Sequence, residues 1–410
     1  MKILWLSHLV PFPPKGGVLQ RSFNLIKQMA KHHEITLIAF NQKALLESSL
    51  PDERSPIEYS KARLLDYVKS VEVLDIPEET IPKGRYLIAL KALLKGQAYN
   101  MEWLISRQAR SHISKVIEQT DFDLVHFDTI SLAPYMDLIG KTPSVLNHHN
   151  FESEMLKSRS LTESNFLLSI FYKYESDRLF GSEERYCKRA CLNITCSDDD
   201  SEMMRSKIPR ANFDVVPNGV DIEYFYPSKE DQVRKGNIVL VGGLSWYPNR
   251  EAVEYFIREI WPRIKAEFPD MTVDIVGRNP TREIIEFGES ERNAQVHGFV
   301  DDVRSYLWQA DFYFCPIRTG GGTKLKILDA LAAGCCIISD PFACKGIAVE
   351  EGRHVLFAEE PGDYVNKIKA AKSDPEISKR LREEGPLLIK NKYSYESIGN
   401  SFSEMVSRLG

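Results

Sequence analysis

The sequence predicts an α/β protein with two doubly wound, Rossmann-like parallel-sheet domains that face each other across a cleft. Short apolar segments alternate with segments of helical periodicity along nearly the whole chain, a pattern typical of parallel sheets covered by helices on both faces. The alternation stops at 218–236, where Asn218-Gly219, Pro227 and alternating charges indicate a linker. A chain of 410 residues is long enough for two domains of ordinary size.

The first half of the chain contains the elements of one sheet. A buried strand at 2–7, a loop rich in proline and glycine, a helix at 19–30 and a strand at 34–40 form one βαβ unit. Further strands are expected at 70–76, 123–127, 143–149, 192–197 and 213–217. Further helices are expected at 86–95, 102–118, over a long region from about 152 to 190, and after Ser197, which is a suitable helix cap.

The second half repeats the alternation after the linker. Strands are expected at 237–243, 272–277, 294–298, 311–317, 336–339 and 355–359. Helices are expected near 249–267, 281–288, 301–309, 323–333 and 395–408. We therefore predict an N-terminal domain over 1–217, the linker over 218–236, a C-terminal domain over 237–390 and a helix within 391–410 that packs back on the N-terminal domain. Because ligands of such sheets bind beyond the carboxyl ends of the strands, the interdomain cleft is the predicted site.

Composition excludes several classes of protein. Lys and Arg number 53 against 58 Asp and Glu, a net charge of −5, so the whole molecule has no field that attracts nucleic acid or an anionic membrane. No run of about twenty apolar residues could span a bilayer, and the N-terminal apolar run is too short for a signal peptide. We expect a cytoplasmic protein. The seven cysteines, an odd number, are expected to be mostly buried free thiols.

A glycine-rich turn carries the strongest chemical signal. Gly320–Gly322 follow the strand at 311–317, and Thr323 is expected to open the next helix. Glycine lets the backbone approach a ligand closely, and the free N–H groups of a helix start bind anions. Lys324 and Arg318 add positive charge. The turn therefore predicts a phosphate site, and a plain turn between strand and helix is the alternative.

Asp329 lies on the helix that follows this turn. Its neighbours Ile327, Leu328, Ala330 and Leu331 are apolar, and a carboxylate among apolar side chains needs a polar partner. The two hydroxyls of a ribose would supply one. An ion pair with Lys326, three residues earlier, is the alternative and stays open.

Three polar residues follow strands of the first half. His148 and His149 end the strand at 143–149, at the edge where such sheets place function, and functional and structural roles are both open. Asp128 follows the strand at 123–127. It either caps the next helix, the favoured interpretation, or orients a substrate hydroxyl.

Residues 83–115 form a basic amphipathic stretch with leucines between lysines and arginines. Such a stretch can lie on a membrane surface, so peripheral membrane contact is one interpretation. A solvated helix face over an apolar core is the favoured alternative.

Four motifs follow one another along the chain: VVPNGVD at 215–221, VGGLSWYPNREAVEYF at 241–256, VHGFVDDV at 296–303 and GGGTKLKILDALAAG at 320–334. In their order and spacing they resemble those of retaining glycosyltransferases of family 4, which have the two-domain GT-B fold. The resemblance covers nearly the whole chain and is densest over 213–360. The last motif is similar to that of a branch whose helix motif contains a Gly-Gly-Gly-Thr run and to which many bacterial exopolysaccharide enzymes belong.

The resemblance implies roles for individual residues. Asp329 falls on the acid that holds the donor ribose, Gly322 and Thr323 fall where backbone N–H groups meet the diphosphate, and Lys324 falls on a basic residue near it. One of His148 and His149 falls on the histidine that lines the sugar pocket. The remaining implied positions are the base-contacting loop with Gly298 and Val300, the donor loop with Gly320, Gly321 and Arg318, and the acceptor side with Gly16, Gly17 and Asp128.

The sequence departs from the family pattern at two places. Gly321 stands where the first acid of the helix motif is expected, and the Arg and Lys that usually follow the strand at 237–241 are absent, with Gly243 and Pro248 nearby. Lys324 or Arg318 would have to compensate. In addition, Asp at 329 is one methylene shorter than the family's Glu.

The resemblance implies a hexosyltransferase-like enzyme that moves a sugar from a nucleotide-diphosphate sugar to a hydroxyl of a glycan, a lipid-linked molecule or a small molecule, with retention and without a metal or other cofactor. A sugar-nucleotide epimerase of the same fold and a non-catalytic nucleotide-sugar-binding scaffold are the alternatives. A nicotinamide-dependent dehydrogenase is disfavoured because no G-x-G-x-x-G follows an opening strand.

Overall fold

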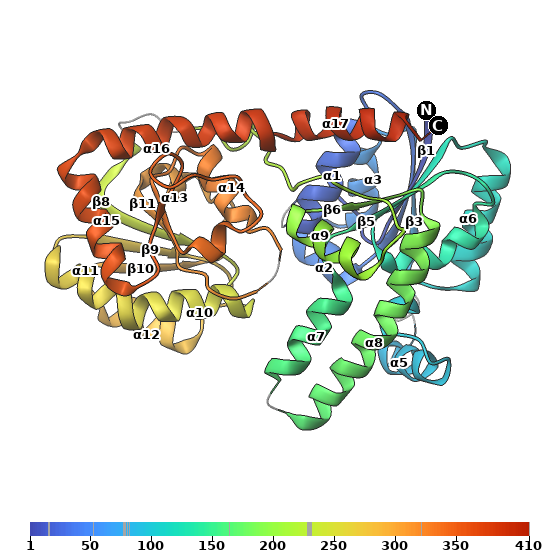
Figure 1. Ribbon diagram of the computed structural model, residues 1–410, viewed down its shortest axis with the longest axis horizontal. Coiled ribbons are helices and arrows are strands. Elements are labelled where there is room, and N and C mark those ends of the chain that lie inside the picture. Colours follow the sequence, from blue (N-terminus) through green and yellow to red (C-terminus); the bar gives the residue numbers. More distant parts are fainter. Residues whose placement is uncertain are drawn as a thin grey trace. The chain divides into compact units, whose positions relative to one another are not determined.

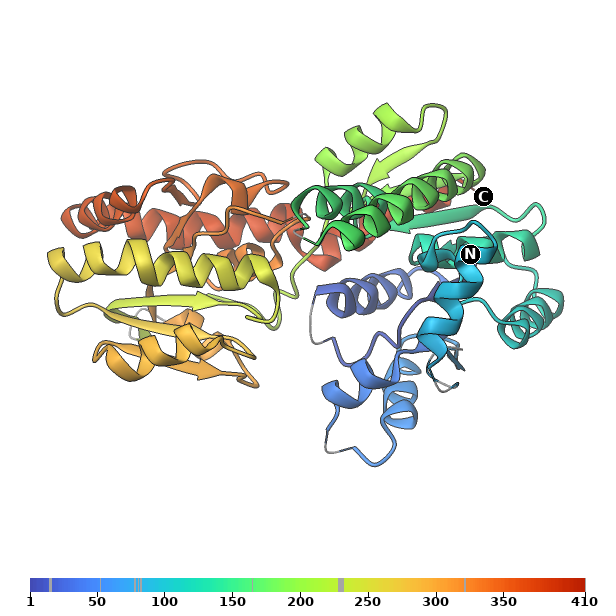
Figure 2. The ribbon, with the colours of Figure 1, turned by 90° about the horizontal axis from the view of Figure 1, so that it is seen from below.

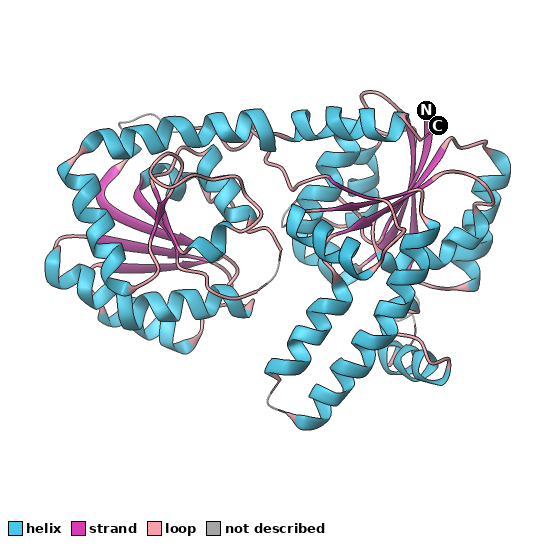
Figure 3. Cartoon of the chain, in the orientation of Figure 1, coloured by secondary structure: helices cyan, strands magenta, loops and turns pink. Residues whose placement is uncertain are grey.

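The computed structural model describes residues 1–410 apart from 15–16, 52, 77–78, 80, 82, 164, 228–231, 321 and 410. The chain divides into two compact units (Figure 1): one contains Met1–Pro217 and Ile398–Gly410, and the other contains Asn218–Ser397. Each unit is a parallel sheet with helices on both faces (Figures 2 and 3), which confirms the predicted fold class. Within the described residues, no helix is both long enough and apolar enough to cross a bilayer.

The first unit contains a seven-stranded parallel sheet in the order β3-β2-β1-β4-β5-β6-β7. The chain runs outward from β1 in both directions, so the loops that follow β1 and β4 leave toward opposite sides and open a crevice between them. The strands are β1 (Lys2–Ser7), β2 (Glu34–Asn41), β3 (Ser70–Asp75), β4 (Leu124–Phe127), β5 (Ser144–His148), β6 (Leu192–Thr195) and β7 (Phe213–Val215).

Helices cover both faces of this sheet. Their bounds are α1 (Gly17–Met29), α2 (Lys43–Ser49), α3 (Pro56–Leu64), α5 (Gly84–Leu94), η1 (Tyr99–Met101), α6 (Arg107–Gln119), η2 (Ile130–Leu138), α7 (Glu152–Thr162), α8 (Phe166–Arg189) and α9 (Asp198–Lys207). The C-terminal helix α17 (Tyr395–Ser407) contributes Ile398, Phe402 and Val406 to the core that contains Trp5 and Leu25.

Two predicted helices of this unit differ in the structure. The helix expected at 102–118 begins at Arg107, because Ser106 accepts a hydrogen bond from the Ala109 N–H and caps it. The region from 152 to 190 is two helices rather than one. Asn165 begins the second helix by accepting hydrogen bonds from the N–H groups of Leu167 and Leu168. The helices α7 and α8 then form a hairpin that projects from the sheet (Figure 1).

The second unit contains a six-stranded parallel sheet in the order β10-β9-β8-β11-β12-β13, so the crevice lies between β8 and β11. The strands are β8 (Arg234–Val241), β9 (Thr272–Val276), β10 (Ala294–Gly298), β11 (Ala310–Cys315), β12 (Ile337–Ser339) and β13 (Leu356–Phe357). The helices are α10 (Tyr247–Tyr255), η4 (Phe256–Ile260), α11 (Trp261–Glu267), α12 (Arg282–Ser290), α13 (Arg304–Gln309), α14 (Leu325–Ala332), η5 (Pro341–Cys344), α15 (Pro361–Ser373), α16 (Pro375–Leu388) and η6 (Ile389–Tyr393).

The segment expected as a linker, 218–236, is largely part of the second unit. Val220 and Phe225 are buried in its core, and β8 already begins at Arg234. The turn residues and charges of this segment indicate an exposed connection, but its apolar side chains anchor it in the core of the second unit.

Candidate active site

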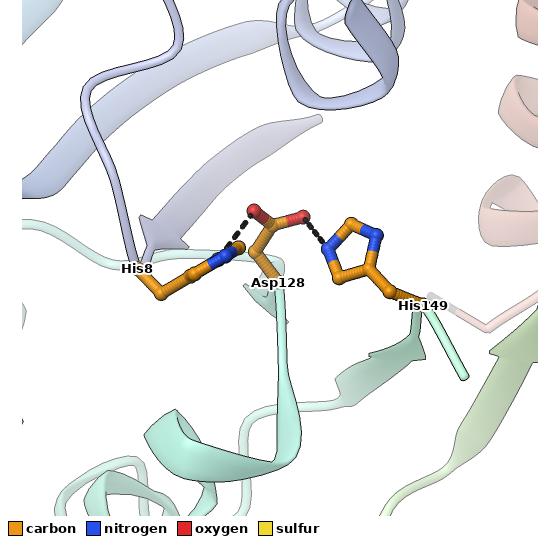
Figure 4. Close-up of side chains that lie close together, drawn as sticks. All are labelled: His8, Asp128 and His149. Carbon is orange, nitrogen blue, oxygen red and sulfur yellow. Dashed lines mark hydrogen bonds and ion pairs between the residues drawn. The ribbon is translucent and has the colours of Figure 1, made fainter. Parts of the chain in front are cut away.

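Three side chains meet at the carboxyl edge of the first sheet (Figure 4). His8 follows β1, Asp128 follows β4 and His149 follows β5, and these three strands are neighbours. His8 Nδ1 lies 3.2 Å from Asp128 Oδ2. His149 Nε2 lies 3.6 Å from Asp128 Oδ1. One carboxylate therefore bridges two imidazoles, and we call these three residues the His–Asp–His cluster.

Asp128 is the buried centre of the cluster, with 1% of its surface exposed. Its Oδ2 also accepts hydrogen bonds from Ser22 Oγ at 2.9 Å and Ser7 Oγ at 3.3 Å. Burial alone would raise the pKa of Asp128, but hydrogen bonds with His149 and His8 outweigh it and hold the pKa well below its ordinary value. The capping interpretation of Asp128 is wrong, because its carboxylate is directed to these side chains and Thr129 occupies the cap position of η2.

Arg21 and Asn147 connect to the cluster through hydrogen bonds. Arg21 Nη2 donates to Asn147 Oδ1 at 3.0 Å, which turns the Asn147 amide NH₂ toward the Asp128 carbonyl oxygen at 3.0 Å and His149 Nε2 at 3.3 Å. Arg21 is itself buried in α1 and also donates to the Pro217 carbonyl at 2.9 Å. The predicted acceptor-side Gly17 is the first residue of α1 and is exposed, whereas Gly16 lies outside the described residues.

The last residue of β5, His148, and the residue that follows it, His149, point in different directions. His148 is buried, 3.2 Å from Asn193 Oδ1 and 3.5 Å from Cys187 Sγ, and burial lowers its pKa to about 4. His149 belongs to the cluster. Burial also lowers the pKa of His149, while Asp128 opposes this shift. The alternation of side chains along a strand therefore brings only one of the two histidines to the site edge.

The glycine-rich turn of the second unit joins β11 to α14. Gly320 and Gly322 have positive φ angles of 93° and 68°, which L side chains rarely adopt, and a Cβ on Gly320 would lie 2.8 Å from Pro248 Cγ. The helix begins at Leu325, two residues later than the predicted start at Thr323, because Lys324 has a ψ of 91° and remains extended. Gly321 lies outside the described residues.

The turn carries two cations and one buried hydroxyl. Lys324 Nζ folds back onto the carbonyl oxygens of Gly322 at 2.9 Å and Gly320 at 3.3 Å. Arg318 Nε bonds Asp340 Oδ2 at 3.1 Å. Thr323 Oγ1 is buried and has no hydrogen-bond partner among the described residues. An anion with several oxygens would satisfy this hydroxyl and draw Lys324 away from the carbonyls.

A third cation, which sequence reasoning missed, reaches the same edge from α14. Lys326 Nζ donates to Asn249 Oδ1 at 2.6 Å, and Asn249 Nδ2 donates to the Gly243 carbonyl at 2.9 Å. A Cβ on Gly242 would lie only 2.3 Å from Lys326 Nζ, so glycine at the end of β8 makes room for the ammonium group. Lys326 thus brings an ammonium group to the end of the strand after which the family resemblance places an Arg and a Lys, and burial lowers the pKa of this group.

Asp329 lies one turn further along α14 and is partly buried. Burial raises its pKa to about 7, and the nearby charge of Lys326 offsets only part of this shift. The alternative ion pair is not formed, since no salt bridge joins Asp329 to Lys326 among the described residues and the ammonium bonds Asn249 instead. On the same sheet, Gly298 ends β10 with a φ of 64° and Val300 follows in the loop.

Sequence reasoning also missed His8. Its position was a usable signal, because His8 directly follows the strand at 2–7 just as Asp128 and His149 follow theirs. The same three side chains are the group, among the residues described, whose atoms could hold a metal ion, with ligand atoms within 4.8 Å of one another. Two imidazoles and a carboxylate suit zinc or iron. In the structure the carboxylate is already saturated by two hydroxyls and two rings.

Comparison with known proteins follows the division into units. A family model described as "Glycosyltransferase Family 4" matches residues 15–224, and one described as "Glycosyl transferases group 1" matches residues 235–374. A phosphatidyl-myo-inositol mannosyltransferase of Mycolicibacterium smegmatis is 26% identical over 238 residues, 55% of each chain. An uncharacterized 44.6 kDa protein in the cps region of Klebsiella pneumoniae is 20% identical, over 56% of this chain and 61% of that protein. The chain thus spans little more than half the length of these relatives.

Solved structures share the fold over the whole chain. Anabaena HepE in complex with UDP and glucose matches with a TM-score of 0.64 and 14% identity, covering 99% of both chains. Sucrose-phosphate synthase from Thermosynechococcus elongatus matches with a TM-score of 0.69 and 15% identity, covering 100% of this chain and 99% of that one. With two parallel sheets of the GT-B type and a family model that matches half of its length, the chain belongs to glycosyltransferase family 4.

Proposed function

We propose that this protein transfers a hexose from a nucleotide-diphosphate sugar to a hydroxyl acceptor, with retention and without a metal ion. The observation that carries the proposal is the turn before α14. There two positive-φ glycines, the unpartnered Thr323 hydroxyl and the ammonium groups of Lys324 and Lys326 gather at the carboxyl edge of one sheet. Anabaena HepE, which shares this fold, has been solved in complex with UDP and with UDP-glucose, which supports the choice of donor.

The donor is held by the second unit in this proposal. The pyrophosphate lies against the turn, where Thr323 and Lys324 stabilise the negative charge that develops as the diphosphate leaves. Lys326 of α14 supplies a second cation beside the end of β8. The carboxylate of Asp329 accepts hydrogen bonds from the ribose hydroxyls. The loop with Gly298 and Val300 contacts the base.

The acceptor is bound by the first unit. His8 and His149 each turn one ring nitrogen to Asp128. The other nitrogen of each ring, which has no hydrogen-bond partner among the described residues, bonds a sugar or acceptor hydroxyl in this proposal. In the reaction the bond between the anomeric carbon and the phosphate oxygen breaks, and a bond to the acceptor oxygen forms. The proton of the acceptor hydroxyl passes to the leaving diphosphate, so no protein nucleophile is required.

The donor is tested by binding. The purified full chain is screened by thermal shift against UDP-, GDP-, ADP- and dTDP-hexoses, since a ligand that binds only the native state raises the melting temperature. One donor class should raise it by several degrees, and Lys324→Ala or Lys326→Ala should abolish the shift. If none of the four classes stabilises the protein, the donor assignment is wrong.

Transfer is tested with the donor that binds. Nucleoside diphosphate should be released only when an acceptor extract is present, EDTA should leave the rate unchanged, and NMR of the product should show the anomeric configuration of the donor. An isomerised donor without acceptor would indicate an epimerase. Binding without release for any acceptor would indicate a scaffold. Loss of activity in EDTA, restored by zinc, would place a metal in the His–Asp–His cluster.

A further inference from the structure

Helix α5 exposes apolar side chains on its outward face. Ile88 and Ala92 are buried against the first unit, yet the opposite side of the helix is apolar as well. The interpretation favoured for 83–115 was a solvated helix face over an apolar core. That interpretation fits α6, where Ala109 and Ile113 face inward, but it does not fit α5. A helix that is apolar all round is expected in a core or a membrane interface rather than in water. The exposed side chains are Tyr86, Leu87, Leu90, Leu93 and Leu94, with exposures from 53% to 79%.

The tip of the α7–α8 hairpin exposes a second apolar set. The hairpin projects from the sheet, and α5 lies beside α8 (Figure 1). Groups of exposed apolar side chains that lie together mark interaction sites. We call these residues and those of α5 together the apolar surface. The tip residues are Leu161, Phe166, Leu167, Leu168, Ile170 and Phe171, with exposures from 44% to 80%.

A basic pocket adjoins the apolar surface. It has a volume of about 520 Å³ and contains the side chains of Lys95, Arg178 and Arg185. The end of α5 meets α8 here, because a Cβ on Gly96 would lie 3.4 Å from Arg178 Nη1. Arg178 and Arg185 stack near Tyr174 and Tyr186, and neither guanidinium has an acidic partner within 4 Å among the described residues.

The carboxylates of this pocket are mostly neutralised. Glu102 is bonded by both Lys91 and Lys95 at 2.7 Å, and Asp137 pairs with Arg189. Asp177 is the remaining acid of the lining. The two free guanidiniums therefore leave the pocket with a net attraction for an anion.

Along one side of α8, the side chains change from apolar near the tip of the hairpin to basic near the pocket. Leu167, Phe171, Tyr174, Arg178 and Arg185 recur at intervals of three, four and seven residues, so they lie along one side of the helix. At a rise of 1.5 Å per residue, the Cα of Arg178 lies roughly 16 Å along the helix from the Cα of Leu167. The apolar side chains therefore lie toward the tip of the hairpin, and the cations lie farther from the tip along the same side of the helix.

The charge of α5 distinguishes the kind of partner. Residues 83–95 contain four cations and no acid, in a chain whose net charge is −5. Glu102 pairs with Lys91 and Lys95 and offsets only one of these four charges. In a twofold dimer a patch meets its own copy, so a second copy would place these cations against each other. An anionic bilayer complements both the charge and the apolar side chains.

We propose that the apolar surface and the basic pocket dock this protein on an anionic phospholipid bilayer, with a headgroup phosphate in the pocket between Arg178 and Arg185. Docking does not depend on the sugar transfer proposed above, because it is measured without donor or acceptor. It requires only the first unit's own residues.

Co-sedimentation of the full chain with vesicles tests the proposal. Binding to vesicles with 30% phosphatidylglycerol should exceed binding to pure phosphatidylcholine vesicles by about tenfold or more, and it should fall as salt rises. Arg178→Gln with Arg185→Gln should lower binding about thirtyfold, the effect expected for the loss of two interfacial cations. Leu167→Ser with Phe171→Ser, and Leu87→Ser with Leu94→Ser, should each lower it at least tenfold.

Matched controls lie on the second unit. Arg282→Gln removes an exposed cation of α12, and Leu387→Ser removes an exposed leucine of α16. Both should bind vesicles like the unaltered protein, and circular dichroism should show every variant folded. Absence of binding to phosphatidylglycerol vesicles, or equal binding by the pocket and apolar variants, overturns the proposal. A dimer that forms with rising protein concentration and that the apolar substitutions dissociate would also overturn it. The same holds if inorganic phosphate protects Arg178 in the pocket and phosphatidylglycerol vesicles do not.

Discussion

At the scale of single residues, the proposed ribose contact of Asp329 should make donor binding depend on pH. Its pKa is raised to about 7 by burial, whereas a ribose diol is bonded best by the ionised carboxylate. Binding of the nucleotide sugar should therefore strengthen as the pH rises from 6 to 8, with release of a proton. Calorimetry in two buffers of different ionisation enthalpy measures that release. Asp329→Asn should bind weakly and without pH dependence, and an unchanged pH profile in this variant would remove Asp329 from the ribose site.

The same shift affects stability. Because the folded pKa lies above the unfolded value near 3.8, the stabilising contribution is complete below about pH 4 and is lost as the pH rises through about 7. Asp329→Asn should therefore match the unaltered protein near pH 4 and exceed it at pH 8, by on the order of 1–3 kcal/mol. Denaturant unfolding at both pH values measures the difference, and a variant that is less stable at pH 8 would contradict the assignment.

The His–Asp–His cluster should separate acceptor chemistry from donor binding. His149→Ala removes one imidazole from the cluster and should lower the transfer rate at least tenfold while the donor still raises the melting temperature. Asp128→Ala should in addition lower the free energy of unfolding by about 2–4 kcal/mol, since it leaves buried hydroxyl and imidazole donors without an acceptor. His32→Ala, an alteration of a histidine whose ring bonds Asn400 far from the cluster, is the control. Equal transfer by all three variants would exclude the cluster from the reaction.

At the scale of elements, the turn between β11 and α14 depends on glycine at 320. Gly320→Ala places a Cβ at a φ of 93° and 2.8 Å from Pro248, so the turn must shift. Donor affinity should fall at least tenfold, measured by calorimetry. Gly352→Ala has a φ of 71° but open space around its Cβ, so it reproduces the backbone strain of about 1 kcal/mol without the collision. Donor affinity in that control should be unchanged, and a similar loss in both would indicate a general destabilisation.

At the scale of the whole molecule, the C-terminal helix stabilises the first unit. Phe402 has 1% of its surface exposed and packs with Ile398 and Val406 in the core that contains Trp5. Phe402→Ala should lower the free energy of unfolding by about 3–5 kcal/mol. Hydrogen exchange should show the loss in β1 and α1 and not in β8 and β9. Glu404→Ala, on the exposed side of the same helix, should change neither, and equal deprotection of both sheets would contradict this assignment.

Local pattern was sufficient for the order of the strands. The apolar strands from 2–7 to 355–359 were predicted close to their observed bounds, because each is a short apolar run between turn residues. The break at Asn165 and the packing of 218–227 in the second core were not predicted. A cap and a core contact each depend on a partner that periodicity does not identify.

For the site, the sequence by itself determined which residues stand at the ends of strands and beside the glycine turn, because that information is local. Only the tertiary structure decided which of them meet. It brought His8 to Asp128 across 120 residues of chain, turned His148 into the core and carried Lys326 to the space above Gly242. The physical reason is that strand order and helix rotation set these distances, and both are fixed by packing of the entire sheet rather than by neighbours in sequence.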